Sequence, residues 1–246
     1  MLHSIIIAHR NRNAHLEECC ASIRASAAVT GQKYEIIVAD NGSATIPAGA
    51  IDREIIIDRS PMELFNKPRL LNLGIAAAGG DILSFLDADA IVGAKWLWGA
   101  RAARRRHLTM VCYRVRYLTP AEPVDWSLYE KKWKGYEAYN TPTYNPVEPP
   151  ARRPGLWVFG NSQFTIARDK LADLRFDEGY AGRGCEDIDM MFQVWIRHKP
   201  DYRAMIWTKA PFAILCRRHG YEEDWKDRNA SARNWALFIN KWRSYG

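Results

Sequence analysis

The stretch Ile82-Leu83-Ser84-Phe85-Leu86-Asp87-Ala88-Asp89 decides the fold of this chain. It is a mostly apolar run that ends in two carboxylates, with Gly79-Gly80 before it and Gly93 after it. An apolar run bounded by turn residues predicts a buried central strand of a parallel sheet, with Asp87 and Asp89 at its carboxyl end. Residues two apart in an extended chain point to the same side, so the pair can hold one hard metal ion. Taken alone, the pair favours a solvated turn or a helix cap over a metal site.

The chain on either side of this run alternates strand and helix patterns. Apolar runs predict strands over 4–8, 34–39 and 54–57. Apolar residues at helical spacing predict one helix that Asn13 caps and a second that Asn66 caps, with Pro68 in its first turn. The resulting order β-α-β-β-α-β is that of a doubly wound nucleotide-binding half, which we assign to residues 1–107.

The second part of the chain has a different character. Residues 118–155 are rich in proline and aromatic residues, which is typical of a lid or a binding loop. The remaining patterns predict helices at 95–107, from Glu186 onward and at 224–242, and strands at 110–117, within 156–167 and at 210–216. The last helix carries one apolar face that we expect to dock on the core: Trp235, Phe238, Ile239 and Trp242.

These elements together predict a single α/β domain. Its central sheet is expected to be mixed, with helices on both faces. Residues 108–220 would form the second half of the domain, and residues 221–246 a C-terminal helix.

Composition narrows the classes of function. No apolar run is long enough to span a bilayer, and the N-terminus lacks a signal-peptide pattern. Five cysteines without a Cys-x-x-Cys pair fit a reducing compartment, so we expect a cytoplasmic protein, with peripheral association at a membrane left open. The net charge of +7 predicts an anionic partner, whether a nucleotide diphosphate, a phosphorylated glycan, nucleic acid or an anionic membrane.

Polar side chains follow the predicted strands and open one predicted helix. Arg10 and Arg12 come after the first strand, where they are either surface residues of a turn or bidentate partners for phosphates. Asp40 ends the second strand and can accept from a base or a ribose. Glu186 and Asp187 follow a glycine-rich segment at a helix start, where they cap the helix or supply a general base.

One histidine follows the last predicted strand. His219 is either a surface residue or a further ligand for a metal held at Asp89.

Several segments match known sequence patterns in the same order along the chain. Ile5-Ile6-Ile7, Val38 to Ser43 and Leu86 to Asp89 resemble the family 2 pattern of the metal-dependent glycosyltransferases with the GT-A fold. Four further segments are similar to the β-1,4-galactosyltransferase type: His9 to Leu16, Phe65 to Gly74, Gly182 to Asp189 and Cys216 to His219.

The resemblance implies an inverting, metal-dependent transferase that moves a sugar from a UDP-sugar to a hydroxyl of a glycan or glycolipid. It implies a donor-binding set of His9, Arg10, Arg12, Asp40, Lys67 and Asp87. It implies that Asp89 and His219 bind Mn²⁺, with Mg²⁺ as a second option. Asp187 would take the acceptor proton, Glu186 would position the sugar or acceptor, and Arg183, Trp157 and Asn161 would contact the acceptor or the sugar.

Departures from the family pattern leave the acceptor open. Cys216 replaces a methionine ligand, and Arg183 replaces a sugar-stacking tryptophan, which indicates an acceptor with anionic character. The basic charge and the aromatic loop at 118–155 make a nucleic-acid acceptor, such as a modified base in viral DNA, an alternative. A non-catalytic module that binds a nucleotide-sugar or a glycan is a third hypothesis.

Overall fold

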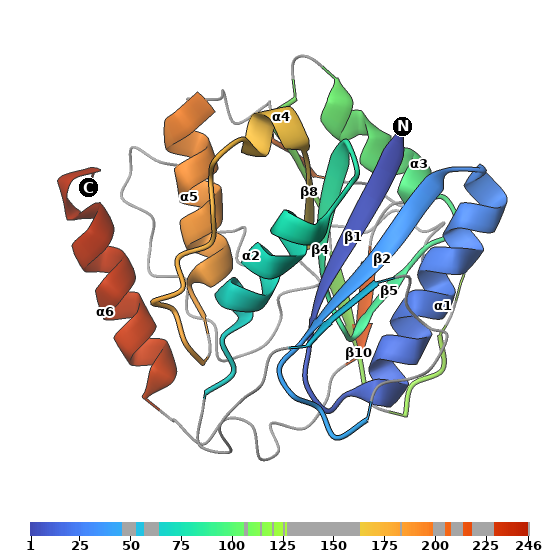
Figure 1. Cartoon of the computed structure of the whole chain (residues 1–246), viewed down its shortest axis with the longest axis horizontal. Helices are drawn as coiled ribbons and strands as arrows, with labels where there is room; N and C mark the ends of the chain where they lie inside the picture. Colours follow the sequence, from blue (N-terminus) through green and yellow to red (C-terminus); the bar gives the residue numbers. More distant parts are fainter. Residues whose placement is uncertain are drawn as a thin grey trace.

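Figure 1 shows a computed structural model of the chain. The structure describes residues 1–45, 53–56, 64–105, 108–113, 115–119, 121–124, 126, 163–182, 184–198, 205–207, 214–217 and 229–245. The strands in these residues are β1 (Leu2–His9), β2 (Lys33–Asp40), β3 (Arg53–Ile56), β4 (Ile82–Asp87), β5 (Ala90–Val92), β6 (Met110–Cys112), β7 (Val115–Leu118), β8 (Phe164–Ala167), β9 (Met205–Trp207) and β10 (Ile214–Arg217). They form a seven-stranded sheet in the order β3-β2-β1-β4-β8-β6-β9 and a three-stranded sheet in the order β5-β10-β7.

The strand at 82–87 lies at the centre of the large sheet, as the sequence predicts. β4 pairs in parallel with β1, and β1 pairs in parallel with β2. On its other side β4 pairs antiparallel with β8. The sheet is therefore mixed, and β4 is the strand at which its direction changes from parallel to antiparallel.

Helices cover both faces of the large sheet (Figure 1). They are α1 (Asn13–Thr30), α2 (Lys67–Ala77), α3 (Trp96–Ala100), α4 (Arg168–Leu171), α5 (Glu186–His198) and α6 (Ala230–Trp242), with short 3₁₀ helices at Arg101–Arg104 and Arg243–Tyr245. Alternate side chains of β1 serve the two faces, because successive residues of a strand point in opposite directions. Ile5 and Ile7 belong to the core cluster beneath α1 and α3, whereas Ile6 and Ala8 belong to the cluster beneath α2, α5 and α6.

Close packing of α2 on β1 depends on Gly74. A Cβ atom added at this position would lie 2.3 Å from Cγ2 of Ile6, so only glycine lets the helix approach the strand this closely. The start of α2 is fixed by Asn66, whose Oδ1 accepts from the Arg69 amide at 3.0 Å, as predicted for an N-cap. This capped helix start delivers Lys67 to the carboxyl end of β4.

Three local predictions are wrong. Residues 110–117 form two strands in different sheets, because the buried Tyr113 lies between them and its hydroxyl bonds to Thr165 of the large sheet at 2.6 Å. The helix predicted at 95–107 is a short α3 followed by a 3₁₀ turn, and the backbone is extended at Arg105. Asn13 is the first residue of α1 rather than its cap, and its side chain donates to Thr45 at 2.8 Å.

The C-terminal helix docks on the core with most of the predicted face. Phe238 is buried, and Trp235 and Trp242 pack against the same cluster. Ile239 is 56% exposed, which corrects its predicted burial. Among the described residues, no helix combines the length and apolar character that crossing a membrane requires.

Candidate active site

The register of the parallel strands aligns the strand ends that carry the candidate residues. His9 of β1 pairs with Asp40 of β2, and the neighbouring Ala8 pairs with Asp87 of β4. The carboxyl ends of these strands therefore meet at one edge of the sheet, which is where open α/β sheets bind ligands.

Lys67 lies among the charges of three carboxylates at this edge. Its ammonium group contacts Asp87, and it lies 3.8 Å from Oε1 of Glu186. Burial lowers the pKa of Lys67, but the charges of Asp87, Glu186 and Asp187 outweigh it and raise the pKa above its ordinary value. Lys67 therefore stays protonated, and it links the end of β4 to the start of α5.

Gln163 fixes the orientation of Asp87. Its Nε2 donates to Oδ2 of Asp87 at 2.9 Å, and its Oε1 accepts from the Asp87 amide at 3.2 Å. Gln163 is itself buried, directly before β8. Sequence reasoning missed this residue, because a lone glutamine beside an apolar strand carries no signal until β8 is known to pair with β4.

Asp187 lies in an environment suited to a base that works near neutral pH. Burial, followed by the negative charge of Glu186, raises the pKa of Asp187 to about 7. Lys67 and the Ile188 amide, which donates to Oδ1 of Asp187 at 2.9 Å, act in the opposite direction. A carboxyl group with this pKa exchanges a proton readily at physiological pH.

His9 and Asp40 hold the loops that follow β1 and β2. Nδ1 of His9 lies 2.8 Å from Oδ1 of Asp40, and its Nε2 accepts from the Arg12 amide at 3.1 Å. This pattern requires a neutral His9 with its proton on Nδ1. The hydroxyl and amide of Ser43 also donate to Asp40. Burial raises the pKa of Asp40, but the hydrogen bonds from His9 and Ser43 outweigh burial and lower the pKa below its ordinary value.

Asp40 is fully buried beneath this network. Arg10 and Arg12 are half-buried in the loop above it. Arg10 and Arg12 are therefore more accessible than Asp40 to a ligand that carries phosphate groups.

Asp89 is a half-buried carboxylate in the turn between β4 and β5. Antiparallel pairing of β5 with β10 sets Cys216 opposite Ala90, so the chain leaves β10 next to Asp89. Burial first, and then the charges of Asp89 and Asp87, raise the pKa of the Cys216 thiol well above its ordinary value. A metal ion would have to displace the proton of this thiol, because the thiolate is the form that binds metals.

The chemistry of the donors suits a hard divalent cation. Carboxylate oxygens are what Mg²⁺ and Mn²⁺ prefer, and Asp89 offers them beside the negative cluster at Asp87. Within the ranges that the structure describes, no three His, Cys, Asp or Glu side chains converge on a metal-sized position. The predicted partner of Asp89, His219, lies outside those ranges.

Other predicted residues also lie outside the described part of the chain: Arg183, Trp157 and Asn161. The same holds for most of the predicted loop at 118–155. The structure thus brings together Lys67, Asp87, Glu186 and Asp187 in one cluster, and it brings His9 and Asp40 together in a second.

Known proteins of similar structure share the fold. Glucosyl-3-phosphoglycerate synthase from Mycobacterium tuberculosis, in complex with Mn²⁺, UDP and glucosyl-3-phosphoglycerate, is 18% identical, with a TM-score of 0.60 over 98% of this chain and 79% of that one. TarS 1–349 from S. aureus with UDP-GlcNAc is 13% identical, with a TM-score of 0.59 over 92% of this chain and 61% of that one. The catalytic domain of Drosophila β1,4-galactosyltransferase 7 with xylobiose is 14% identical, with a TM-score of 0.56 over 92% and 75%.

This chain spans less than two thirds of the TarS chain. No curated protein matches it.

The family is shown by a match to a family model. The model described as glycosyl transferase family 2 matches residues 4–174 of the 246. The predicted resemblance to glycosyltransferases is confirmed, and the chain belongs to glycosyl transferase family 2 with the GT-A fold.

Proposed function

We propose that this protein is an inverting, metal-dependent glycosyltransferase that moves a sugar from a UDP-sugar to a hydroxyl of a glycan or glycolipid acceptor. The observation that carries the proposal is the cluster in which the buried Lys67 pairs with Asp87 and Glu186, beside the buried Asp187 with its raised pKa. The donor class is supported by the TarS structure with UDP-GlcNAc and by the mycobacterial synthase structure with UDP.

In the proposed reaction Asp187 is the general base. Its carboxylate takes the proton of the acceptor hydroxyl while that oxygen attacks the anomeric carbon of the donor. The bond between the anomeric carbon and the diphosphate oxygen breaks, and UDP leaves with the electron pair. Attack on the face opposite to the leaving group inverts the anomeric centre. Glu186, beside the base, positions the acceptor or the donor sugar.

Cationic and polar groups at the sheet edge bind the donor in this proposal. Arg10 and Arg12 pair with the diphosphate, since guanidinium groups bind phosphates bidentately. Lys67 adds a permanent positive charge that stabilises the diphosphate as it leaves. Asp40 and His9 fix the loops that carry the arginines, and they support the uridine side of the site.

A divalent cation fits the oxygen donors at this edge. Asp89 and His219 would hold Mn²⁺, or Mg²⁺, and Asp87 would support it toward the ribose. The chemistry that such an ion supplies when bound is neutralisation of charge on the leaving diphosphate. The mycobacterial synthase structure contains Mn²⁺, which supports this choice.

The acceptor and the location complete the proposal. Arg183, Trp157 and Asn161 would contact the acceptor or the sugar, and the arginine suits an acceptor with anionic character. All five cysteines are free and buried, which agrees with a reducing, cytoplasmic location.

The proposal is tested by a donor screen. Release of UDP is measured for a panel of UDP-sugars with Mn²⁺, Mg²⁺ or a chelator, and mass spectrometry follows products on glycan, glycolipid and nucleic-acid acceptors. We expect metal-dependent transfer with inverted configuration, as seen by NMR of the product's anomeric proton. Binding of UDP without transfer to any acceptor would contradict the proposal, as would retention of configuration.

A further inference from the structure

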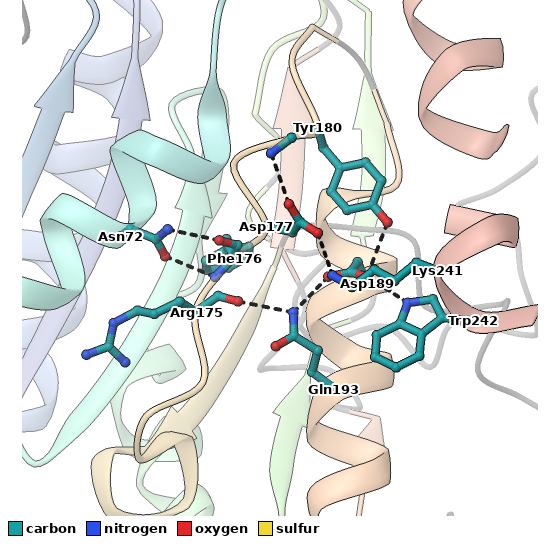
Figure 2. Close-up of polar contacts among 10 residues, drawn as sticks. Asn72, Arg175, Phe176, Asp177, Tyr180, Asp189, Gln193, Lys241 and Trp242 are labelled. Carbon is teal, nitrogen blue, oxygen red and sulfur yellow. Dashed lines mark hydrogen bonds and ion pairs between the residues drawn. The ribbon is translucent and has the colours of Figure 1, made fainter. Parts of the chain in front are cut away.

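A second buried carboxylate, two residues beyond Asp187, has no role in the proposed chemistry. Asp189 in the first turn of α5 is fully buried, and four side chains donate to it (Figure 2). Its Oδ1 accepts from the Trp242 indole at 2.7 Å and from the Tyr180 hydroxyl at 3.2 Å. Its Oδ2 accepts from Gln193 at 2.7 Å and from the Lys241 ammonium at 3.0 Å.

The donors come from three segments of the chain. Tyr180 belongs to the segment before α5, Gln193 lies one turn further along α5, and Lys241 and Trp242 end α6. Lys241 also donates to Asp177 at 2.6 Å, so it reaches the same preceding segment (Figure 2). Asp189 therefore ties α6 to α5 and to the chain that leads into α5.

That leading chain has a strained backbone. The φ angles of Gly182, Gly184 and Cys185 are +81°, +94° and +76°, directly before Glu186. Glycine adopts such angles freely, but Cys185 does so only where its surroundings enforce the conformation.

Helix α6 supplies contacts that enforce this conformation. The amide of the buried Asn234 donates to the carbonyl oxygens of Ala181 at 3.2 Å and Gly184 at 3.0 Å. A Cβ added at Gly182 would lie 2.8 Å from Cβ of Ala230 at the start of α6, so the two segments are in close contact.

We propose that Asp189 is a positioning residue that clamps α6 onto the start of α5 and so holds Glu186 and Asp187 against Lys67 and Asp87. The inference rests on the proposed function, since it assigns Asp187 as the base. Without the clamp, the strained turn relaxes and the two carboxylates lose their fixed distance from Lys67. A displacement of about 1 Å in a catalytic group can cost about 100-fold in rate.

Two variants test the clamp. Asp189→Asn keeps the shape of the side chain, but its amide nitrogen cannot accept two of the four hydrogen bonds. Trp242→Phe removes a single hydrogen bond and keeps an aromatic ring against Phe192, whose ring centroid lies 4.8 Å away. The matched control is Asp173→Asn, which removes an exposed carboxylate that also pairs with α5, through Arg197 at 2.7 Å.

The kinetic readout separates positioning from general stability. We expect kcat to fall by about 100-fold in Asp189→Asn and by about 10-fold in Trp242→Phe, with the donor KM within about twofold of wild type. The acidic limb of the rate profile should also move, because Asp187 would lose part of its burial, which raises its pKa, and its fixed distance from Lys67, which lowers it. The other charges facing Asp187, from Glu186, Lys67 and Asp87, are retained in both variants.

Hydrogen exchange of the amides at residues 181–188 gives a readout that needs no activity. We expect faster exchange there in both test variants and exchange at the wild-type rate in the control. Unchanged kcat, pH profile and exchange in folded Trp242→Phe would overturn the inference, as would rates that fall only in proportion to the folded fraction. If the wild-type protein transfers no sugar, the proposed function fails, and unchanged exchange in Trp242→Phe would then overturn the clamp separately.

Discussion

Replacing Glu186 by glutamine should make the protein more active at acidic pH relative to its own maximum. Burial is the largest cause of the raised pKa of Asp187, and the negative charge of Glu186 is the second. The Glu186→Gln change removes the second cause and leaves the first. The acidic limb of the rate profile, which reports deprotonation of the base, should therefore move to lower pH.

The size of the shift follows from the environment of Asp187. Its pKa is raised from 3.8 to about 7, and one nearby like charge accounts for about one unit of such a rise. The limb should then lie near pH 6 in the variant. At pH 6 about 9% of the wild-type base is deprotonated and about 50% of the variant's, a gain of about fivefold in normalised rate.

The assay is the initial rate of UDP release from pH 5 to 9, each profile scaled to its own plateau. Scaling removes the loss of absolute kcat that follows if Glu186 also positions the sugar. Lys67→Met should move the limb the other way, because Lys67 lowers the pKa of Asp187. An unmoved limb in Glu186→Gln, or one at higher pH, would refute this account of the base.

Three further predictions concern stability. Burial lowers the pKa of His3 to about 3. As the pH falls below about 6.5, His3 therefore binds a proton in the unfolded chain but not in the folded protein. The free energy of unfolding should fall by about 2 kcal/mol between pH 7 and pH 5 for this reason. Urea titrations of His3→Gln, which can still reach Ser84, should lack this part of the loss; an identical pH dependence would contradict it. Gly74→Ala should cost about 1–3 kcal/mol despite the better helix propensity of alanine, because its Cβ meets Ile6; a higher Tm would contradict the packing. Asn66→Ala should cost about 1 kcal/mol through the lost cap; Asn66→Asp keeps the cap but loses the hydrogen bond that the Asn66 amide donates to the Glu178 carbonyl at 2.9 Å, so it should recover only part of the loss in the same thermal melts.

Local sequence patterns predicted much of the fold because its strands are continuous apolar runs. Each strand of the β-α-β-β-α-β half was predicted to within a few residues, and Asn66 was correctly predicted as a helix cap. Residues 110–117 were predicted as one strand because Val111, Tyr113, Val115 and Tyr117 recur at every second position. Their division between two sheets depends on what Tyr113 meets on β8, and no local pattern carries that information.

The candidate site was predicted where residues follow strand ends or motifs, and missed where a role depends on distant partners. Lys67 and Asp87 are 20 positions apart; the family resemblance implied that both bind the donor, but their contact with each other was not predicted. Gln163 and Asp189 gain their roles from residues 76 and 53 positions away, respectively. Long-range hydrogen bonds of this kind leave no periodicity in the sequence.

The central claim is that Asp187 is the base of a site whose donor groups lie on other elements. The most direct measurement compares wild type with Asp187→Asn in one preparation, with donor binding by calorimetry in the presence of Mn²⁺ and transfer under saturating acceptor. The account predicts an unchanged Kd for the UDP-sugar and a rate lower by about 100-fold or more, the contribution expected of a general base. An Asp187→Asn protein that transfers sugar at the wild-type rate would contradict it.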